Sequence, residues 1–250
     1  MLLSVLAACS PPRSANRGVE SSSSEGTASR AQAGQAIPVW WSTSELGIAR
    51  LSDIDSELAK PFEGGITLSN AEREKALVAD CATARDLQAR GFAAQYPRDI
   101  STLGVLTAKC LALEALRTVK PARMSFLPTR PYSASIIEFL PAALAPTGSA
   151  ARAIAIQRAT AGGQPIRMVE VTVAFEAARD EEILIKGEGW QETLTLLGRG
   201  DFDADGKQDW LLRADLAMEG GTNHNSRLFL MSRDSPDEVI AVKRELKPGR

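Results

Sequence analysis

The feature that most constrains this fold is a change in the spacing of apolar residues near Arg167. Upstream, apolar residues recur at helical spacing. Downstream they alternate with other residues, as Val169, Val171 and Val173 do. Alternation predicts strands because successive strand side chains point to opposite faces, and short connections favour antiparallel pairing. Six strands are expected, at residues 167–175, 182–186, 190–197, 210–214, 227–233 and 239–244.

The first half of the chain is expected to be mainly helical. Residues 44–58 are typical of a short helix or helical turn. Ser69 and Glu72 form a capping-box pattern, which predicts a helix over residues 71–90. A second helix is predicted over residues 102–119. The apolar faces of these two helices hold Leu77, Cys81, Ala84 and Leu87, and then Leu103, Leu106, Cys110, Leu113 and Leu116.

These patterns predict an α+β fold, in which a helical N-terminal part packs on one face of a C-terminal antiparallel sheet. Order is expected to begin at Ile37, with Trp40 and Trp41 as core anchors or a domain lid rather than a ligand platform. Residues 121–165 are expected to form loops with one or two short strands or helical turns. The predicted regions are residues 1–8 (signal peptide), 9–36 (tether), 37–165 (mainly helical) and 166–247 (β region).

Composition excludes several classes of function. The 250 residues carry a formal net charge of -2, so no strong field attracts nucleic acid. Aromatic residues make up only 5%, which argues against a stacking platform for bases. The three cysteines and one histidine fit no zinc-ligand spacing.

The sharpest chemical signal is a nine-residue run that begins at Asp201. Its aspartates occupy positions 1, 3, 5 and 9, and Gly206 at position 6 permits a sharp turn. Calcium takes six to eight oxygen ligands from flexible loops of this kind. The alternative is an acidic turn that binds no ion. The predicted calcium ligands are Asp201, Asp203, Asp205, the backbone carbonyl of Lys207, and Asp209.

This loop resembles the calcium loops of FG-GAP and integrin-type repeat proteins. It is not an EF-hand, because position 12 is Leu212 rather than Glu and both flanks are expected to be strands. The resemblance covers only residues 200–214 and occurs once, so it implies a structural calcium ion between strands and does not imply a propeller.

The first nine residues end in Leu6-Ala7-Ala8-Cys9, which resembles the lipobox of bacterial lipoproteins. The resemblance implies cleavage before Cys9 and acylation of that residue, which would anchor the protein firmly in a membrane. No basic segment precedes the short apolar run, so the natural start is expected to lie further upstream. The alternative is a cytosolic protein with an apolar N-terminus.

Residues 10–36 are rich in Ser, Pro, Gly, Ala and Arg, and predict a tether that does not fold by itself. Ser10, rather than Asp, follows the cysteine. By the same resemblance this favours an outer-membrane lipoprotein that faces the periplasm.

Cys81 and Cys110 are expected on the buried faces of neighbouring helices, and export would favour a disulfide between them. The alternative is two free buried thiols. Cys9 would then be the unpaired cysteine, used for lipidation.

No nucleophile motif of the Gly-x-Ser-x-Gly type, phosphate-binding loop or dinucleotide fingerprint is present. We therefore expect no enzyme, but a cell-envelope lipoprotein that binds the membrane through its lipid anchor, binds calcium structurally and serves as a binding or assembly module for an envelope protein. The alternative is an envelope hydrolase with a carboxylate-based site around residues 201–209.

Overall fold

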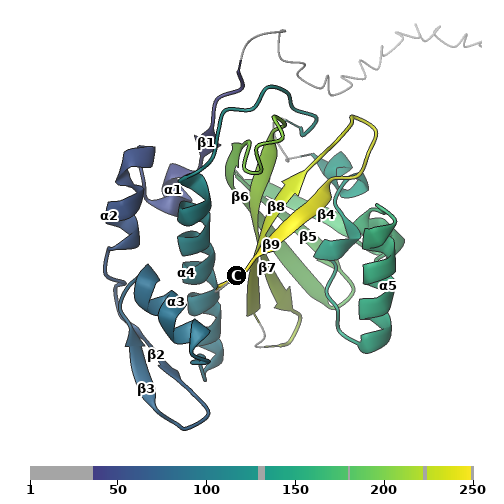
Figure 1. The fold of residues 1–250 in the computed structure, drawn as a ribbon. Helices are drawn as coiled ribbons and strands as arrows, with labels where there is room; N and C mark the ends of the chain where they lie inside the picture. The colour runs from purple at the N-terminus through teal and green to yellow at the C-terminus, as the bar shows by residue number, and fades with distance from the viewer. Residues whose placement is uncertain (1–35, 129–132, 180, 222–223, 249–250) are drawn as a thin grey trace, which may run out of the picture.

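A computed structural model describes residues 36–128, 133–179, 181–221 and 224–248. Its centre is a seven-stranded antiparallel sheet with helical segments on both faces (Figure 1). Six strands follow one another in the order β4-β5-β6-β7-β8-β9, and β1 pairs with the end of β6. The strands are β1 (Trp40–Trp41), β4 (Ala174–Arg179), β5 (Glu182–Gly187), β6 (Trp190–Gly200), β7 (Asp209–Met218), β8 (His224–Ser232) and β9 (Ala241–Leu246).

The middle of the sheet is buried on both faces. Along β7, Trp210 and Leu212 belong to the core on one face, whereas Leu211 belongs to the core on the other. Segments that precede β4 in the chain complete both cores, through Leu140 on the first face and Leu113 of a helix on the second. The helical part and the sheet therefore share their hydrophobic cores. The expected α+β arrangement is confirmed, with two covered faces instead of one.

Helices α1–α4 lie on one side of the sheet in Figure 1. The longest, α4, starts with a proline, which suits the first helical position because its missing N–H needs no partner there. Its predicted apolar positions Leu103, Cys110, Leu113 and Leu116 are buried. The helical elements of this layer are α1 (Thr43–Leu46), the 3₁₀ turn η1 (Leu51–Asp53), α2 (Ile54–Leu58), α3 (Cys81–Ala89) and α4 (Pro97–Leu116).

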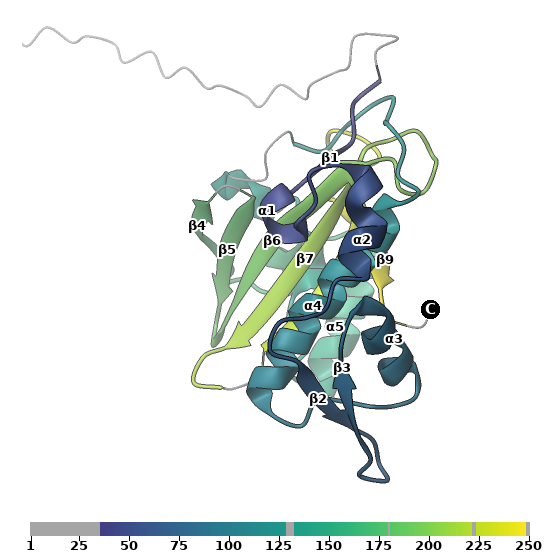
Figure 2. The ribbon, with the colours of Figure 1, turned by 90° about the vertical axis from the view of Figure 1, so that its left-hand side faces the viewer.

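The predicted helix over residues 71–90 is wrong in its first half. A hairpin of β2 (Ile66–Ser69) and β3 (Lys75–Val78) occupies this stretch, as Figure 2 shows at the foot of the molecule. Asn70 explains the turn, because its side-chain oxygen accepts a hydrogen bond from the backbone N–H of Glu74 at 2.9 Å. The helix begins only at Cys81, where Asp80 caps it by accepting from the Thr83 backbone N–H at 2.8 Å. Leu77, expected in the core, is 59% exposed.

The predicted strand over residues 167–175 is also wrong, except at residues 174 and 175, where β4 (Ala174–Arg179) begins. A 3₁₀ turn, η4 (Ile166–Met168), and a loop precede β4, and Val171 is 83% exposed. The buried carboxylate of Glu170 holds this loop. It accepts hydrogen bonds from the Thr172 hydroxyl at 2.6 Å and the Trp190 indole N–H at 3.2 Å, and it pairs with Arg152. These contacts compete with the extended conformation that alternation favours.

Residues 133–165 cover the first face of the sheet, the one that holds Trp210 and Leu212. Short helical turns were expected there, and η2 (Ala134–Glu138) and η3 (Ala142–Leu144) agree with that expectation. A longer helix, α5 (Ala150–Ala161), follows them. Ser149 caps it by accepting from the Arg152 backbone N–H at 3.2 Å. Within the described part of the chain, no helix combines the length and the apolar character that crossing a membrane requires.

Candidate metal centre

The aspartate loop connects β6 to β7, at one end of the two longest strands of the sheet. Asp201 directly follows β6, and Asp209 is the first residue of β7. Because Gly200 pairs with Asp209 across the two strands, the register brings the first and last aspartates of the loop together. The sheet thus places two carboxylates that are eight positions apart at the base of one loop.

Hydrogen bonds inside the loop fold it around its own carboxylates. One oxygen of Asp201 accepts from the Gly206 backbone N–H at 3.0 Å, and one oxygen of Asp209 accepts from the Phe202 backbone N–H at 2.9 Å. Gly206 has φ +85° and Ala204 has φ +67°, so two left-handed residues bend the chain back on itself. The other oxygen of each of these two buried carboxylates takes no part in these hydrogen bonds.

Asp201, Asp203 and Asp209 offer a group of oxygen atoms that lie within 4.8 Å of one another. Asp203 is exposed, whereas Asp201 and Asp209 are only 6% and 0% exposed. The Oδ1 atoms of these two buried carboxylates make no well-formed hydrogen bond among the described residues, although the Ser232 hydroxyl lies close enough to Asp209 to act on its pKa. A buried carboxylate oxygen without a partner is costly, and a bound cation would remove that cost.

Electrostatics point the same way. Burial raises the pKa of the Asp209 carboxyl to about 6, and the charges of Asp203 and Asp205 act in the same direction. A cation bound beside Asp209 would stabilise its charged form and offset this shift. A cluster of three carboxylates fits hard cations that prefer oxygen ligands, such as Ca²⁺, Mg²⁺ or Mn²⁺.

Three of the five predicted ligand residues come together in this way, and two lie beside them. The exposed Asp205 accepts a hydrogen bond from the Lys207 backbone N–H at 2.7 Å. The Lys207 ammonium pairs with Asp234, which follows β8 and also binds Lys243 at 3.1 Å. The hydrogen bond to Asp234 raises the pKa of Lys207. The side chain of Lys207 therefore ties the loop to the β8–β9 connection.

A segment that the sequence did not mark as functional, residues 120–125, supports the loop from outside. Lys120 and Asp201 exchange two backbone hydrogen bonds, at 3.0 and 2.8 Å. Further along, the Arg123 backbone N–H donates to the Gly206 carbonyl at 2.8 Å. Gly200 allows this close approach, since a Cβ there would lie 2.3 Å from a methyl carbon of Val119. The loop is thus held between the sheet and a second strand-like segment.

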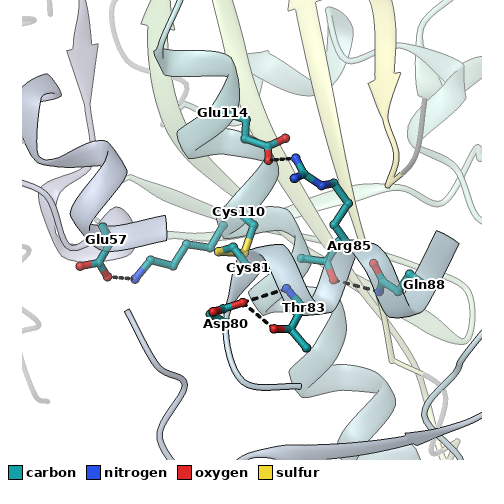
Figure 3. Close-up of a disulfide and its surroundings, with 10 residues drawn as sticks. Glu57, Asp80, Cys81, Thr83, Arg85, Gln88, Cys110 and Glu114 are labelled. Atoms are coloured by element: carbon teal, nitrogen blue, oxygen red, sulfur yellow. Dashed lines mark hydrogen bonds and ion pairs between the residues drawn. A yellow bond between two sulfur atoms is a disulfide. The ribbon is translucent and has the colours of Figure 1, made fainter. Parts of the chain in front are cut away.

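The predicted disulfide is confirmed. Cys81 at the start of α3 is bonded to Cys110 in α4, with 5.6 Å between their Cα atoms, and both residues are buried (Figure 3). Polar contacts surround it, including an ion pair of 2.8 Å between Arg85 and Glu114. The bond fixes α3 against α4 far along the chain from the aspartate loop. Cys9, the predicted lipidation site, lies outside the described residues.

Comparison with known proteins adds no family to this picture. No family model matches the chain, and neither the curated proteins nor the solved structures contain a similar protein. Function is therefore inferred from the residues of this chain.

Proposed function

We propose that this protein is a cell-envelope lipoprotein that acts as a non-catalytic binding or assembly module, with a calcium ion as a structural clamp in the Asp201–Asp209 loop. One observation carries the calcium part of the proposal. Asp201 and Asp209 are buried, each has an oxygen without a hydrogen bond among the described residues, and together with the exposed Asp203 they offer oxygen atoms within 4.8 Å of one another.

Calcium fits this loop better than other biological cations. The proposed ligands supply only oxygen atoms, whereas zinc in proteins favours nitrogen and sulfur. These ligands are the carboxylates of Asp201, Asp203, Asp205 and Asp209 and the backbone carbonyl of Lys207. Calcium accepts irregular coordination by a flexible loop, whereas magnesium demands near-octahedral geometry. The exposed side of the cluster at Asp203 leaves room for water ligands.

The lipoprotein part rests on residues 6–9 and on the polar stretch that follows them. The disulfide between Cys81 and Cys110 supports export, because such bonds persist mainly in oxidising compartments. A calcium clamp would agree with export, since extracellular modules bind this ion at the concentrations found outside the cytoplasm.

The alternative of an envelope hydrolase has one observation in its favour, the raised pKa of Asp209, since perturbed acids often mark catalytic sites. Asp209 is 0% exposed, however, so its carboxyl group cannot meet a substrate in this arrangement. A structural role accounts for both the burial and the pKa.

The calcium clamp is tested by thermal unfolding of the full chain in chelator, in calcium and in magnesium. Calcium at a hundred times its Kd should stabilise the fold by about 2.7 kcal/mol, which raises Tm by about 5–10 °C for a chain of this size. In Asp203→Ala, which alters an exposed residue, the calcium effect should disappear while Tm in chelator stays close to that of the wild type. Equal Tm values of the wild type in chelator and calcium would contradict the clamp.

The lipid anchor is tested by metabolic labelling with radioactive palmitate in a bacterial host. Label should enter the wild type and a Ser10→Ala control, and should be absent from Cys9→Ser. Label that persists in Cys9→Ser would refute the anchor.

A further inference from the structure

A groove of about 480 Å³ lies between α4 and the C-terminal strands, and residues 225–228 line it at the end of β8 opposite to the end that pairs beside the aspartate loop. Apolar side chains form most of its wall, and Ile100, at 44% exposure, stands at its opening. The apolar wall consists of Phe92, Ile100, Leu103, Leu111, Leu228 and Leu246. A concave apolar surface of this size is in the range of binding sites in proteins.

The groove continues into a free sheet edge. β9 is the last strand of the sheet, and in the described part of the chain it pairs only with β8. Glu245 and Leu246 belong to β9 and also line the groove, so edge and groove form one surface. A free edge presents backbone N–H and C=O groups that can pair with another strand.

We propose that this surface binds an extended segment of a partner protein, which adds as a strand beside β9 and alternates apolar with acidic side chains. In such strand addition the backbone supplies affinity and alternate side chains supply specificity. Apolar side chains on one face of the added strand would fill the groove. The proposal rests on the binding role proposed above and specifies the kind of partner.

Charge selects the partner. On β9, Lys243 already pairs with Asp234 at 3.1 Å, and Glu245 pairs with Lys247 at 3.0 Å, so the exposed Arg244 is the charge on this strand that a partner residue would meet. A second copy of this chain is a poor occupant, because antiparallel pairing of two β9 strands about their centre would place Lys243 of each copy opposite Arg244 of the other. Like charges directly opposite each other destabilise a strand pair. An acidic segment would meet complementary charge instead.

The test uses fluorescence anisotropy with the full chain in mild detergent at low salt. The probe is a fluorescein-labelled peptide that alternates Val with Glu. Its length of about seven residues is that of a typical strand. A Val/Lys peptide is the control. We expect saturable binding of the Val/Glu peptide and at least tenfold weaker binding of the Val/Lys peptide, since electrostatic complementarity sets specificity.

Matched variants locate the site. Arg244→Glu and Ile100→Glu should each weaken Val/Glu binding by about tenfold, through charge reversal and through a charge at the apolar opening. Arg158→Glu and Ile154→Glu make the same exchanges at exposed positions of α5 and should leave binding unchanged. Hydrogen exchange should show new protection of β9 amides when the Val/Glu peptide binds.

Equal binding of the two peptides would overturn the proposal. So would unchanged affinity in both groove variants, peptide binding without protection of β9, or self-association of the chain that Arg244→Glu alters. None of these outcomes affects the calcium-dependent rise in Tm, so failure of the docking site is distinguishable from failure of the calcium clamp.

Discussion

Replacing Glu192 by Gln is expected to remove a pH dependence of stability that is built into the core. Glu192 lies on β6, is 0% exposed, and accepts a hydrogen bond at 3.1 Å from Arg227. Its second oxygen has no partner among the described residues. Burial raises the pKa of Glu192 from 4.5 to about 7, although Arg227 acts to lower it.

The magnitude follows from the two pKa values. They differ by 7 − 4.5, or about 2.5 units, and each unit is worth about 1.4 kcal/mol, so ionisation of Glu192 costs the folded state about 3 kcal/mol. The folded state holds this proton more tightly than the unfolded state does. The stabilisation is therefore fully present below about pH 4.5 and is lost as pH rises through about 7. Between pH 5 and 8 the ionisation of Glu192 should lower the free energy of unfolding by about 2–3 kcal/mol.

The assay is denaturant unfolding of the wild type and Glu192→Gln from pH 5 to 8, in saturating calcium. Gln keeps the size and one acceptor, and Arg227 keeps its bonds to the backbone carbonyls of Ala143 and Leu144. The variant should gain about 2–3 kcal/mol relative to the wild type across this range. Glu188→Gln, in an exposed turn, should show no such gain. A difference curve for Glu192→Gln that stays flat with pH would refute the reasoning.

Three further predictions follow from other contacts. The double variant Cys81→Ser with Cys110→Ser lacks the disulfide, which joins positions 29 apart. In denaturant unfolding its free energy of unfolding should be lower by about 3–4 kcal/mol, as the chain-entropy model predicts. A decrease below about 1 kcal/mol would contradict a structural role of the disulfide. Gly187→Ala places a Cβ 2.3 Å from the buried Trp190 ring, so Tm should fall and tryptophan fluorescence should shift to the red. Glu188→Ala, at an exposed position of the same turn, should leave the fluorescence of Trp190 unchanged. Asp209→Asn removes a buried carboxyl group whose pKa is raised to about 6. In chelator at neutral pH the variant should therefore be more stable than the wild type by up to about 3 kcal/mol, and added calcium should not stabilise it further. Lower stability of the variant in chelator would contradict the destabilising effect assigned to that carboxylate.

Strands β5–β9 could be predicted from the sequence because the pleat of a strand translates directly into alternation. Their short connections then imposed antiparallel pairing. The β2–β3 hairpin could not be predicted in this way, since Ser69 and Glu72 also fit a helix start. The side chain of Asn70 decided the outcome by bonding to the backbone of Glu74. Competition between local hydrogen bonds is not visible in a periodic pattern.

The metal loop, too, could be predicted from the sequence only in part. Spacing alone indicated that Asp201, Asp203 and Asp209 converge, because all three lie in the loop of residues 201–209. The support from residues 120–125 comes from about eighty positions earlier and leaves no local pattern. Glu192 is a similar case. Alternation along β6 places Glu192 on the same face as the buried Trp190 and Leu194, but the arginine that contacts it, Arg227, comes from β8 and leaves no local pattern.

The most direct measurement of the central claim is calorimetric titration of calcium chloride into the full chain after removal of metal with a chelator. One calcium ion should bind per chain, and binding should be lost in Asp203→Ala but retained in Asp86→Asn, which alters an exposed aspartate on α3. Absence of calcium binding to the wild type, or unchanged binding to Asp203→Ala, would contradict the assignment of a calcium clamp to the Asp201–Asp209 loop.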